Sequence, residues 1–413
     1  MKPHFYESIQ GWFDFQDIYT QVVQEASDGS KFVEVGSWLG RSAAFMAVEI
    51  ANSGKKIDFY AVDTWRGSAE HTGVVAKNGG SVREIFDSNM ERGGVGQIVK
   101  PVEAPSVEAA ERFADGSLDF VFVDASHDFV NVFADVRAWY PKVKPGGVIA
   151  GHDIGWGGLL AAVQQRVPAR SIKERVTSWW FRKPASVDDI FEDASGLRVV
   201  GDHLLFIPVV NRLDLLQEAV ESIPPAVRAV VVDQTNGLGD QIKALLPGHV
   251  GYVKTPKRLL FSEVQNAMLH AASLLGVKTL MFMHSDGKCD PTVVEKLVHA
   301  SSDESDWGVI FTNYDVLCAF NVRGLLDRVG FWDETFEWYA SDCDFYRRIV
   351  LSGLRIVETG LPVDHRPSST INSDPSEMVR VNAAADKRVN HYRHKWGGRP
   401  GHERNKIPYD GKP

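Results

Sequence analysis

The chain has 413 residues, of which 44% are hydrophobic and 24% charged, and its formal net charge is −9. This length exceeds what one hydrophobic core usually supports, so two domains of about 200 residues are expected. The acidic balance argues against a protein built mainly to grip nucleic acid. The cysteines, Cys289, Cys318 and Cys343, are too few and too unevenly spaced for a disulfide framework, which favours a reducing compartment.

The start of the sequence, residues 1–5, lacks the basic stretch and apolar run of a signal peptide. No apolar run approaches the roughly 18 residues that a membrane span needs. We therefore expect a cytoplasmic protein that reaches any membrane-bound substrate from outside the bilayer. The sequence leaves the oligomeric state open.

The first half of the chain alternates short apolar segments with segments of helical character. Strands are predicted at 32–35, 57–62, 97–100, 118–123 and 148–151, and helices at 42–52 and 130–140. This alternation predicts a mostly parallel sheet with helices on both faces, which binds ligands at the carboxyl ends of its strands. Residues 66–96 are glycine-rich and polar, which is typical of a long functional or disordered loop.

A second alternation follows residue 200. Strands are predicted at 204–208, 229–233, 279–283 and 309–311, and helices at 213–222, 262–275 and 290–301. The fold class is therefore α/β with two doubly wound domains, residues 1–200 and residues 201–413. The basic, glycine- and proline-rich tail at 391–413 is expected to be loosely ordered.

Two features of the first half suit a nucleotide-like ligand. Gly36 and Gly40 lie between a predicted strand and helix, where glycine lets a ligand approach the backbone closely. A tight strand-to-helix turn is the alternative explanation. Asp63 ends the next strand, where a carboxylate can accept both hydroxyls of a ribose, although a solvated loop acid would look the same.

Asp124, His127, His152 and Asp153 follow two strands that should be neighbours. Carboxylates and imidazoles gathered there can hold a divalent cation or supply a general base. Either histidine alone is equally compatible with a capping, surface or packed position. The four groups together favour a site.

Residues 31–165 resemble the class I S-adenosylmethionine-dependent methyltransferases, and most closely the metal-dependent sugar O-methyltransferases of the macrocin type. The matching segments are 33–42, 122–127 and 144–153. The resemblance implies a Rossmann-like fold. It also implies that S-adenosylmethionine is held by four residues: Glu34, Gly36, Gly40 and Asp63.

The same resemblance assigns the acid and imidazole groups. It implies Mg²⁺ at Asp124 and Asp153, joined by His152, which stands where related enzymes often have an acid. His127 would be the base that removes the proton of a sugar hydroxyl. The alternative is a site in which His127 acts without a metal.

The second half carries an acid after an apolar strand, in His284-Ser285-Asp286. A carboxylate beside a flexible turn can bind a cation that neutralises a departing diphosphate. An ordinary turn is the alternative explanation for these three residues. Asp233 ends an earlier strand, where it could meet a base or ribose. Asp342 and Asp344 open a predicted helix, where acids also suit the helix dipole.

Residues 203–367 resemble the inverting GT-A glycosyltransferases of the family 2 type, through the segments 206–212, 231–233 and 320–334. The resemblance implies Asp342 as the catalytic base, with Asp344 as its substitute. It implies a nucleotide-sugar donor near Pro208 and Asp233. Mn²⁺ or Mg²⁺ would be bound by three residues: Asp286, His365 and His284, the last of which replaces the first acid of the usual Asp-any-Asp triplet.

Trp332, Trp338 and Tyr339 stand just before Asp342 and could stack on an acceptor sugar, although core packing is as good an explanation for each. The leading hypothesis is a bifunctional enzyme that glycosylates and methylates a glycan, a glycoprotein or a small glycosylated acceptor. One alternative keeps a single active transferase, with the other domain as a binding module. Another is an enzyme that modifies nucleic-acid bases, which the net charge disfavours.

Overall fold

The computed structural model describes residues 1–67, 72–155, 158–168, 171–197, 201–302, 306–336, 339–366, 373, 378–379 and 385–411. They divide into two compact units, the first made mainly of residues 1–167 and 171–185, the second of residues 186–410. The division falls before the boundary near residue 200 that composition predicts. The reason is backbone pairing, because the amide of Glu192 donates to the carbonyl of Lys254 in the second unit, at 2.7 Å.

The first unit is built on a seven-stranded sheet in the order β3-β2-β1-β4-β5-β7-β6. Its strands are β1 (Lys31–Val35), β2 (Asp58–Asp63), β3 (Val99–Glu103), β4 (Leu118–Val123), β5 (Val143–Gly151), β6 (Lys173–Arg175) and β7 (Ser178–Arg182). Strands β1 to β5 are parallel, as predicted, whereas β7 runs antiparallel to β5 and pairs with β6 in a hairpin. The sequence analysis did not anticipate this hairpin.

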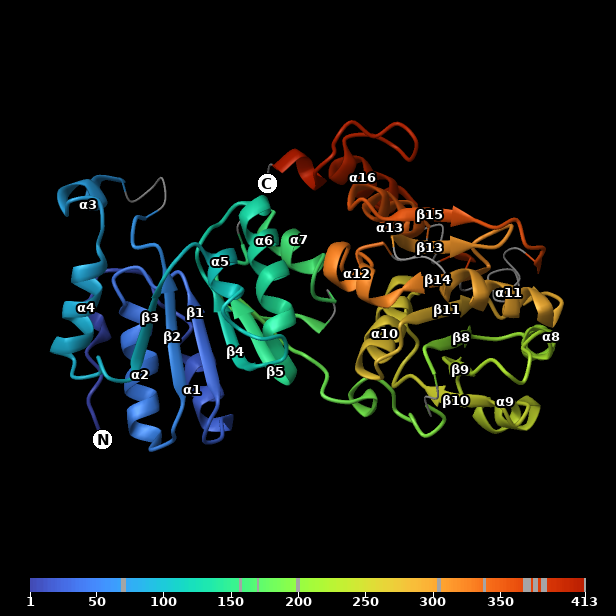
Figure 1. Cartoon of the computed structure of the whole chain (residues 1–413), viewed down its shortest axis with the longest axis horizontal. Coiled ribbons are helices and arrows are strands. Elements are labelled where there is room, and N and C mark those ends of the chain that lie inside the picture. Colours follow the sequence, from blue (N-terminus) through green and yellow to red (C-terminus); the bar gives the residue numbers. More distant parts are fainter. Residues whose placement is uncertain are drawn as a thin grey trace. The chain divides into compact units, whose positions relative to one another are not determined.

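Helices flank this sheet on both sides (Figure 1). One large core joins α1 (Gln16–Glu25), α2 (Arg41–Ser53) and α4 (Arg83–Arg92) to alternate strand residues such as Phe32, Phe59 and Phe120. The remaining helices contact one another in sequence, and two of them also contact β2 and β4. They are α5 (Ser106–Ala110), α6 (Phe129–Trp139) and α7 (Leu159–Gln164).

The expectation of a long loop at 66–96 is wrong. This stretch contains α3 (Thr72–Lys77) and α4. Val82, Phe86 and Met90 recur every four residues and are all buried, so one apolar stripe packs α4 against the core. Glycines on either side of this stripe concealed the helical period.

The second unit has its own seven-stranded sheet, in the order β10-β9-β8-β11-β14-β13-β15. The strands are β8 (His203–Val209), β9 (Ala229–Asp233), β10 (Val250–Lys254), β11 (Thr279–Met283), β13 (Trp307–Phe311), β14 (Leu317–Asn321) and β15 (Arg355–Glu358). Strand β14 is antiparallel to β11 and β13, so the sheet is mixed. A short antiparallel pair, β12 (Gly287–Lys288) and β16 (Asp364–His365), lies apart from this sheet.

Helices also cover this second sheet. A core of aliphatic strand residues packs against α8 (Leu213–Glu221), α9 (Gly239–Leu245) and α11 (Pro291–Ser302). Helix α10 (Phe261–Leu274) contacts β8, β11 and α12 (Val322–Arg328), and α13 (Ser341–Leu351) contacts β15. Among the described residues, none of the helices combines the length and apolar character that a membrane crossing requires.

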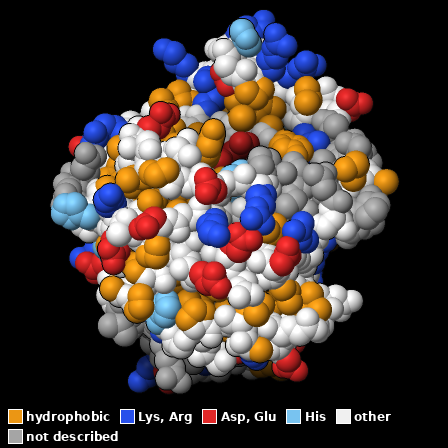
Figure 2. Space-filling view, turned by 90° about the vertical axis from the view of Figure 1, so that its right-hand side faces the viewer, with side chains coloured by type: hydrophobic (Ala, Val, Ile, Leu, Met, Phe, Trp, Pro, Cys, Tyr) orange, Lys and Arg blue, Asp and Glu red, His pale blue; other side chains and the backbone are white. Residues whose placement is uncertain are grey.

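The expectation of a loosely ordered tail is wrong for the described residues 391–411. Helix α16 (Ala385–Trp396) buries Tyr392 and Trp396 in a small cluster with Phe336. Asp386, Lys387 and Arg393 of this helix are exposed, whereas Arg388 and Lys395 are buried. Figure 2 shows Lys and Arg side chains gathered at the top of the view, where the C-terminal segment lies. Exposed basic residues of that segment include Arg393, Arg399, Arg404 and Lys406.

Candidate active sites

A cavity of about 1020 Å³ opens at the carboxyl ends of the parallel strands of the first unit. Its lining includes six residues singled out from the sequence: Gly36, Asp63, Asp124, His127, His152 and Asp153. They meet because β1 pairs with both β2 and β4, and β4 pairs with β5. The predicted edge of the sheet therefore carries the candidate site.

The two glycines of the first turn have different structural reasons. Gly36 has a φ of 95°, and a Cβ there would lie 2.1 Å from the backbone oxygen of Asp124. Gly40 has a φ of 89°, and its Cβ would meet the Met90 side chain at 2.6 Å. Gly40 does not line the cavity, so its small size serves the packing of α2 on α4.

The two acids predicted to hold the cofactor are also placed differently. Asp63 lines the cavity and accepts hydrogen bonds from the backbone amides of Trp38 and Trp65, both at 2.7 Å. Glu34 is 1% exposed and lies behind the wall, where the Tyr19 hydroxyl donates to it at 2.6 Å. Burial raises the pKa of Glu34. Asp63 can therefore touch a ligand directly, whereas Glu34 supports the wall.

Imidazoles and carboxylates that follow β4 and β5 form a close cluster. His127 Nε2 lies 2.8 Å from Asp153 Oδ2, and His152 Nδ1 lies 3.1 Å from the same oxygen. His152 Nδ1 is also 3.7 Å from Asp124 Oδ1. Asp153 has a φ of 58°, a left-handed conformation that Asp adopts more readily than most residues.

The crowding of charge shifts the titration of this cluster. Burial, with Asp153, Glu34 and Asp14, raises the pKa of Asp124 to about 8, although His152 opposes the shift. Burial lowers the pKa of His152, but Asp153, Asp124 and Asp14 outweigh it and raise the value to about 9. Groups perturbed together in one cavity are typical of functional sites.

Two further residues complete the cluster, and the sequence analysis missed both. Asp14 Oδ1 lies 2.9 Å from His152 Nε2, and the Thr177 hydroxyl donates to Asp14 Oδ2 at 2.8 Å. Asp14 precedes α1 and Thr177 lies in the β6–β7 turn, so neither follows a parallel strand. The signal available in the sequence was an acid, Asp14, between two aromatic residues. One of these, Phe15, stacks on Phe122 with ring centroids 4.2 Å apart, which holds Asp14 near the end of β4.

The first-unit cluster fits a divalent cation. Asp124, His152 and Asp153 each offer a ligand atom, and these atoms lie within 4.8 Å of one another. Carboxylate oxygens with one imidazole suit such an ion. A positive charge here would favour the ionised form of Asp124, whose pKa is raised first by burial and then by the neighbouring acids.

A second cluster forms in the second unit, because β12 and β16 pair Gly287 with His365. Asp286 Oδ1 lies 3.5 Å from His365 Nε2 and 3.9 Å from His284 Nδ1. Burial lowers the pKa of His284 despite Asp286, so the imidazole stays in the neutral form that binds metals. The three ligand atoms lie within 4.8 Å of one another, which again fits a cation.

Basic side chains lie beside this cluster. A cavity of about 250 Å³ is lined by Asp286, Lys288 and Arg366, among others. Lys288 Nζ and Arg366 Nη2 approach the same oxygen of Glu218, at 3.3 and 3.0 Å. Basic groups that share one half-buried carboxylate can exchange it for a phosphate.

The residues predicted to hold the sugar donor lie elsewhere. Pro208 pairs with Val232 in the sheet, and neither Pro208 nor Asp233 lines the 250 Å³ cavity. Asp233 is 1% exposed, and its carboxylate accepts from the Thr235 amide and the Tyr252 hydroxyl, both at 2.7 Å. These bonds make Asp233 part of the interior in this structure.

Asp342 lies half-buried in the first turn of α13. Burial and the nearby charge of Asp315 raise its pKa. Asp315 acts electrostatically on His284 as well, so it links Asp342 to the histidine–acid cluster. Asp315 is a third residue that the sequence analysis missed, because it lies in the turn before β14.

The substitute base and the aromatic platform need correction. Asp344 is fully buried and accepts hydrogen bonds from Arg348 at 2.9 Å and Trp396 at 2.8 Å, so the expectation that it could replace Asp342 is wrong. Trp332 is 2% exposed and stacks on Phe345, so it belongs to the core. Tyr339 is 56% exposed, and Trp338 lies outside the described residues.

Each of the two units carries one acid–imidazole cluster that is a candidate active site. Residues 33–154 match the family described as Methyltransferase domain, and residues 205–354 match Glycosyl transferase family 2. The chain therefore carries a segment similar to methyltransferase domains and a segment similar to family 2 glycosyl transferases, and both units are α/β.

One curated relative is the uncharacterized protein y4gI of Sinorhizobium fredii, 26% identical over 152 residues. The match covers 37% of this chain and 16% of that protein, so the chain spans a small part of its relative.

Solved structures that resemble the chain include the O-methyltransferase NovP, with 15% identity, 41% of this chain, 79% of that chain and a TM-score of 0.33. Another is an S-adenosylmethionine-dependent O-methyltransferase of Thermotoga maritima, with 13% identity and a TM-score of 0.31. The match covers 42% of this chain and 68% of that chain. Likeness at this level says nothing further about this chain.

Proposed function

We propose that the chain is bifunctional. Its second unit transfers a sugar from a nucleotide-sugar to a glycan or glycoconjugate acceptor, and its first unit O-methylates a sugar hydroxyl with S-adenosylmethionine. The observation that carries this proposal is the presence of one acid–imidazole cluster in each unit, each beside a cavity. The first cluster lies inside the matching family segment, and so do His284 and Asp286 of the second, whereas His365 lies just beyond it. The sites are separate, so the two activities should be separable.

In the first unit the cavity offers a place for each reactant. Gly36 and Asp63 line the cavity at the carboxyl ends of β1 and β2, and Asp63 accepts the ribose hydroxyls of the cofactor there. The acceptor oxygen attacks the methyl carbon as the sulfur takes the electron pair of the breaking bond. His127 accepts the hydroxyl proton, and Asp153, at 2.8 Å, stabilises the imidazolium that forms. Positioning supplies much of the acceleration.

A divalent cation such as Mg²⁺ at Asp124, His152 and Asp153 would lower the pKa of the attacking hydroxyl. Asp14 and Thr177 serve this cluster by fixing the ring of His152 from its other nitrogen. The residues therefore combine metal binding with a base that touches the same carboxylate.

In the second unit Asp342 removes the proton of the acceptor hydroxyl. The oxygen attacks the anomeric carbon from the face opposite the departing diphosphate, so the configuration inverts. Asp286, His284 and His365 would hold Mn²⁺ or Mg²⁺, which offsets the charge of the leaving group.

Calorimetry tests the proposal directly. The chain is titrated with S-adenosylmethionine, and separately with UDP-, GDP- and dTDP-sugars in the presence of Mn²⁺. Binding of the cofactor and of one sugar nucleotide, each unaffected by the other, supports two sites. Binding of only one donor class contradicts bifunctionality and leaves one active transferase. Salt-dependent retention on DNA would instead favour a nucleic-acid modifier.

A further inference from the structure

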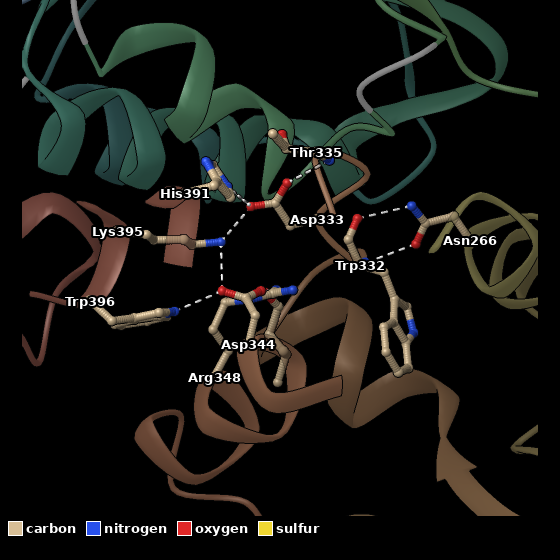
Figure 3. Close-up of polar contacts among 10 residues, drawn as sticks. Asn266, Trp332, Asp333, Thr335, Asp344, Arg348, His391, Lys395 and Trp396 are labelled. Atoms are coloured by element: carbon tan, nitrogen blue, oxygen red, sulfur yellow. Dashed lines mark hydrogen bonds and ion pairs between the residues drawn. The ribbon is translucent and has the colours of Figure 1, made fainter. Parts of the chain in front are cut away.

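The C-terminal helix α16 is tied into the second unit by a buried ion network (Figure 3). Lys395 has no exposed surface, and its ammonium lies 2.7 Å from Asp333 Oδ2 and 2.7 Å from Asp344 Oδ1. Both carboxylates are themselves buried. One side chain of α16 therefore bridges two acids that lie eleven positions apart, on two different segments.

Neighbouring donors complete the network. His391 Nε2 lies 3.0 Å from Asp333 Oδ2, and Trp396 Nε1 donates to Asp344 Oδ1 at 2.8 Å. Arg348 donates to the other oxygen of Asp344 at 2.9 Å. Burial would raise the pKa of Asp333, but Lys395 and His391 outweigh it and hold the pKa well below its usual range.

One of the two acids belongs to a segment that precedes α13, and the other belongs to the first turn of α13, which carries Asp342. Asp333 lies in the segment 329–336, which is clamped from α10 because Asn266 accepts from the Trp332 amide at 2.8 Å and donates to its carbonyl at 3.0 Å. Asp344 lies in the first turn of α13, two positions after Asp342. Side chains two apart on a helix point in different directions, so α16 grips one side while Asp342 projects from another.

A need for stability alone explains this network poorly. Replacing a buried ion pair by apolar side chains is often neutral or stabilising, because the desolvation of the charges offsets their attraction. A buried ammonium that joins two segments does fix their relative geometry. The bridge from α16 to both segments is therefore better explained by a requirement for placement.

We propose that Lys395 is a positioning residue for sugar transfer, which joins the segment 329–336 to the first turn of α13 and thereby holds Asp342 in place. The inference rests on the proposed role of Asp342 as the base. The C-terminal helix is then part of the acceptor side of the site, although it lies outside residues 205–354 that match the glycosyltransferase family.

The first test is Lys395→Met, which removes the ammonium and keeps the aliphatic stem. The kcat of sugar transfer should fall on the order of 10²-fold, the cost of a small misplacement of a reacting group. The KM for the sugar nucleotide should stay unchanged, and so should methyl transfer by the first unit. Lys278→Met is the matched control, because Lys278 pairs with Asp202 at 2.8 Å on the exposed surface.

A double variant separates placement from stability. Lys395→Met leaves two buried acids with only Arg348 and His391 as basic partners, so its Tm should fall. Asp333→Asn added to Lys395→Met restores the charge balance, because Asp344 and Arg348 remain as a pair. We expect the Tm to recover while the kcat stays low. Recovery of kcat together with Tm would overturn the proposal.

Hydrogen exchange keeps this inference distinct from the proposed function. Sugar transfer lost in Asp342→Asn but fully retained in Lys395→Met rejects the positioning role alone. A chain that transfers no sugar from any donor rejects the proposed function instead. In that case hydrogen exchange of the backbone amides of residues 341–345 still tests the inference. Faster exchange of these amides in Lys395→Met than in the unaltered chain, with exchange in β8 and β11 unchanged, supports the positioning role of Lys395. Equal exchange in the two proteins overturns it.

Discussion

The two acid–imidazole clusters contain the same kinds of side chain in different proportions, so carboxylates predominate in the first and imidazoles in the second. In the first unit three carboxylates, Asp14, Asp124 and Asp153, surround one histidine, and His127 touches the cluster directly. In the second unit two imidazoles share Asp286, and the proposed base, Asp342, lies on α13. In the proposed mechanism, the first site places its base in contact with a metal ligand, and the second site places its base on a separate element.

This difference has chemical consequences. A carboxylate-rich set favours hard cations such as Mg²⁺, whereas two imidazoles with one carboxylate also suit Mn²⁺ and softer ions. Direct contact between a base and a metal ligand makes their titrations interdependent. Each prediction below asks whether the contrast between a coupled and a separated base holds.

The largest effect is expected from Asp342→Asn. Loss of the general base should lower the kcat of sugar transfer by about 10³-fold while the affinity for the sugar nucleotide is kept. Steady-state kinetics and calorimetry measure the two quantities. The exposed pair of Asp327 with Arg323 supplies the control, since Asp327→Asn should change neither. Retained turnover in Asp342→Asn would place the base elsewhere, and the buried Asp344 would not be the substitute.

His127→Ala should lower methyl transfer by about 10²-fold at unchanged cofactor affinity. Because His127 contacts Asp153, adding Asp153→Asn should cost less than the product of the single effects. In the second unit Asp342→Asn and Asp286→Asn should combine close to multiplicatively. Single-turnover rates of the single and double variants measure whether the losses multiply. Multiplicative losses in both units would mean that the base is no more coupled to its metal ligands in the first unit than in the second. His4→Ala, which breaks a 3.0 Å pair with Glu49, is the control.

The sequence was sufficient for features that repeat along the chain. Strands β1, β4, β8, β9 and β11 are nearly continuous apolar runs, so their positions and the residues that follow them could be predicted. Asp124 and Asp153 could be placed together for this reason. Features that interrupt the alternation could not be placed, such as the β6–β7 hairpin that carries Thr177 near His152.

Burial was the other limit. A sequence shows an acid after a strand, but the direction of its side chain depends on partners far along the chain. Asp344 and Asp342 differ by two positions, and only contacts with α16 show that Asp344 is structural. Gly40 similarly resembles a ligand-binding glycine until its contact with Met90 is known.

Metal affinity should respond to pH differently in the two units. At pH 7 Asp124, with a pKa of about 8, and His152, with a pKa of about 9, hold protons that a cation must displace. The deprotonated fraction rises about 10-fold for Asp124 and about 50-fold for His152 from pH 7 to 9, so Mg²⁺ or Mn²⁺ affinity at the first site should rise about 500-fold. The pKa of His284 is lowered, so the second site should change much less.

Calorimetry with Mn²⁺ in several buffers measures this affinity and the protons released. Asp286→Asn isolates the first site, and Asp124→Asn isolates the second. A first site whose affinity is flat across this range would mean that the proposed ligands do not bind the ion. An equal rise at both sites would remove the electrostatic contrast.

The smallest expected effect concerns the two acids that end the second strand of each sheet. Asp63 and Asp233 both accept the amide two positions ahead at 2.7 Å, but only Asp63 lines a described cavity. Asp63→Ala should weaken S-adenosylmethionine binding about tenfold, the worth of a hydrogen bond to a charged group, and leave sugar-nucleotide binding intact. Asp63→Asn keeps one acceptor oxygen and should lose less. Equal loss of both donors in Asp63→Ala, measured by calorimetry, would contradict separate sites, because no residue of the second unit depends on this carboxylate in the proposal.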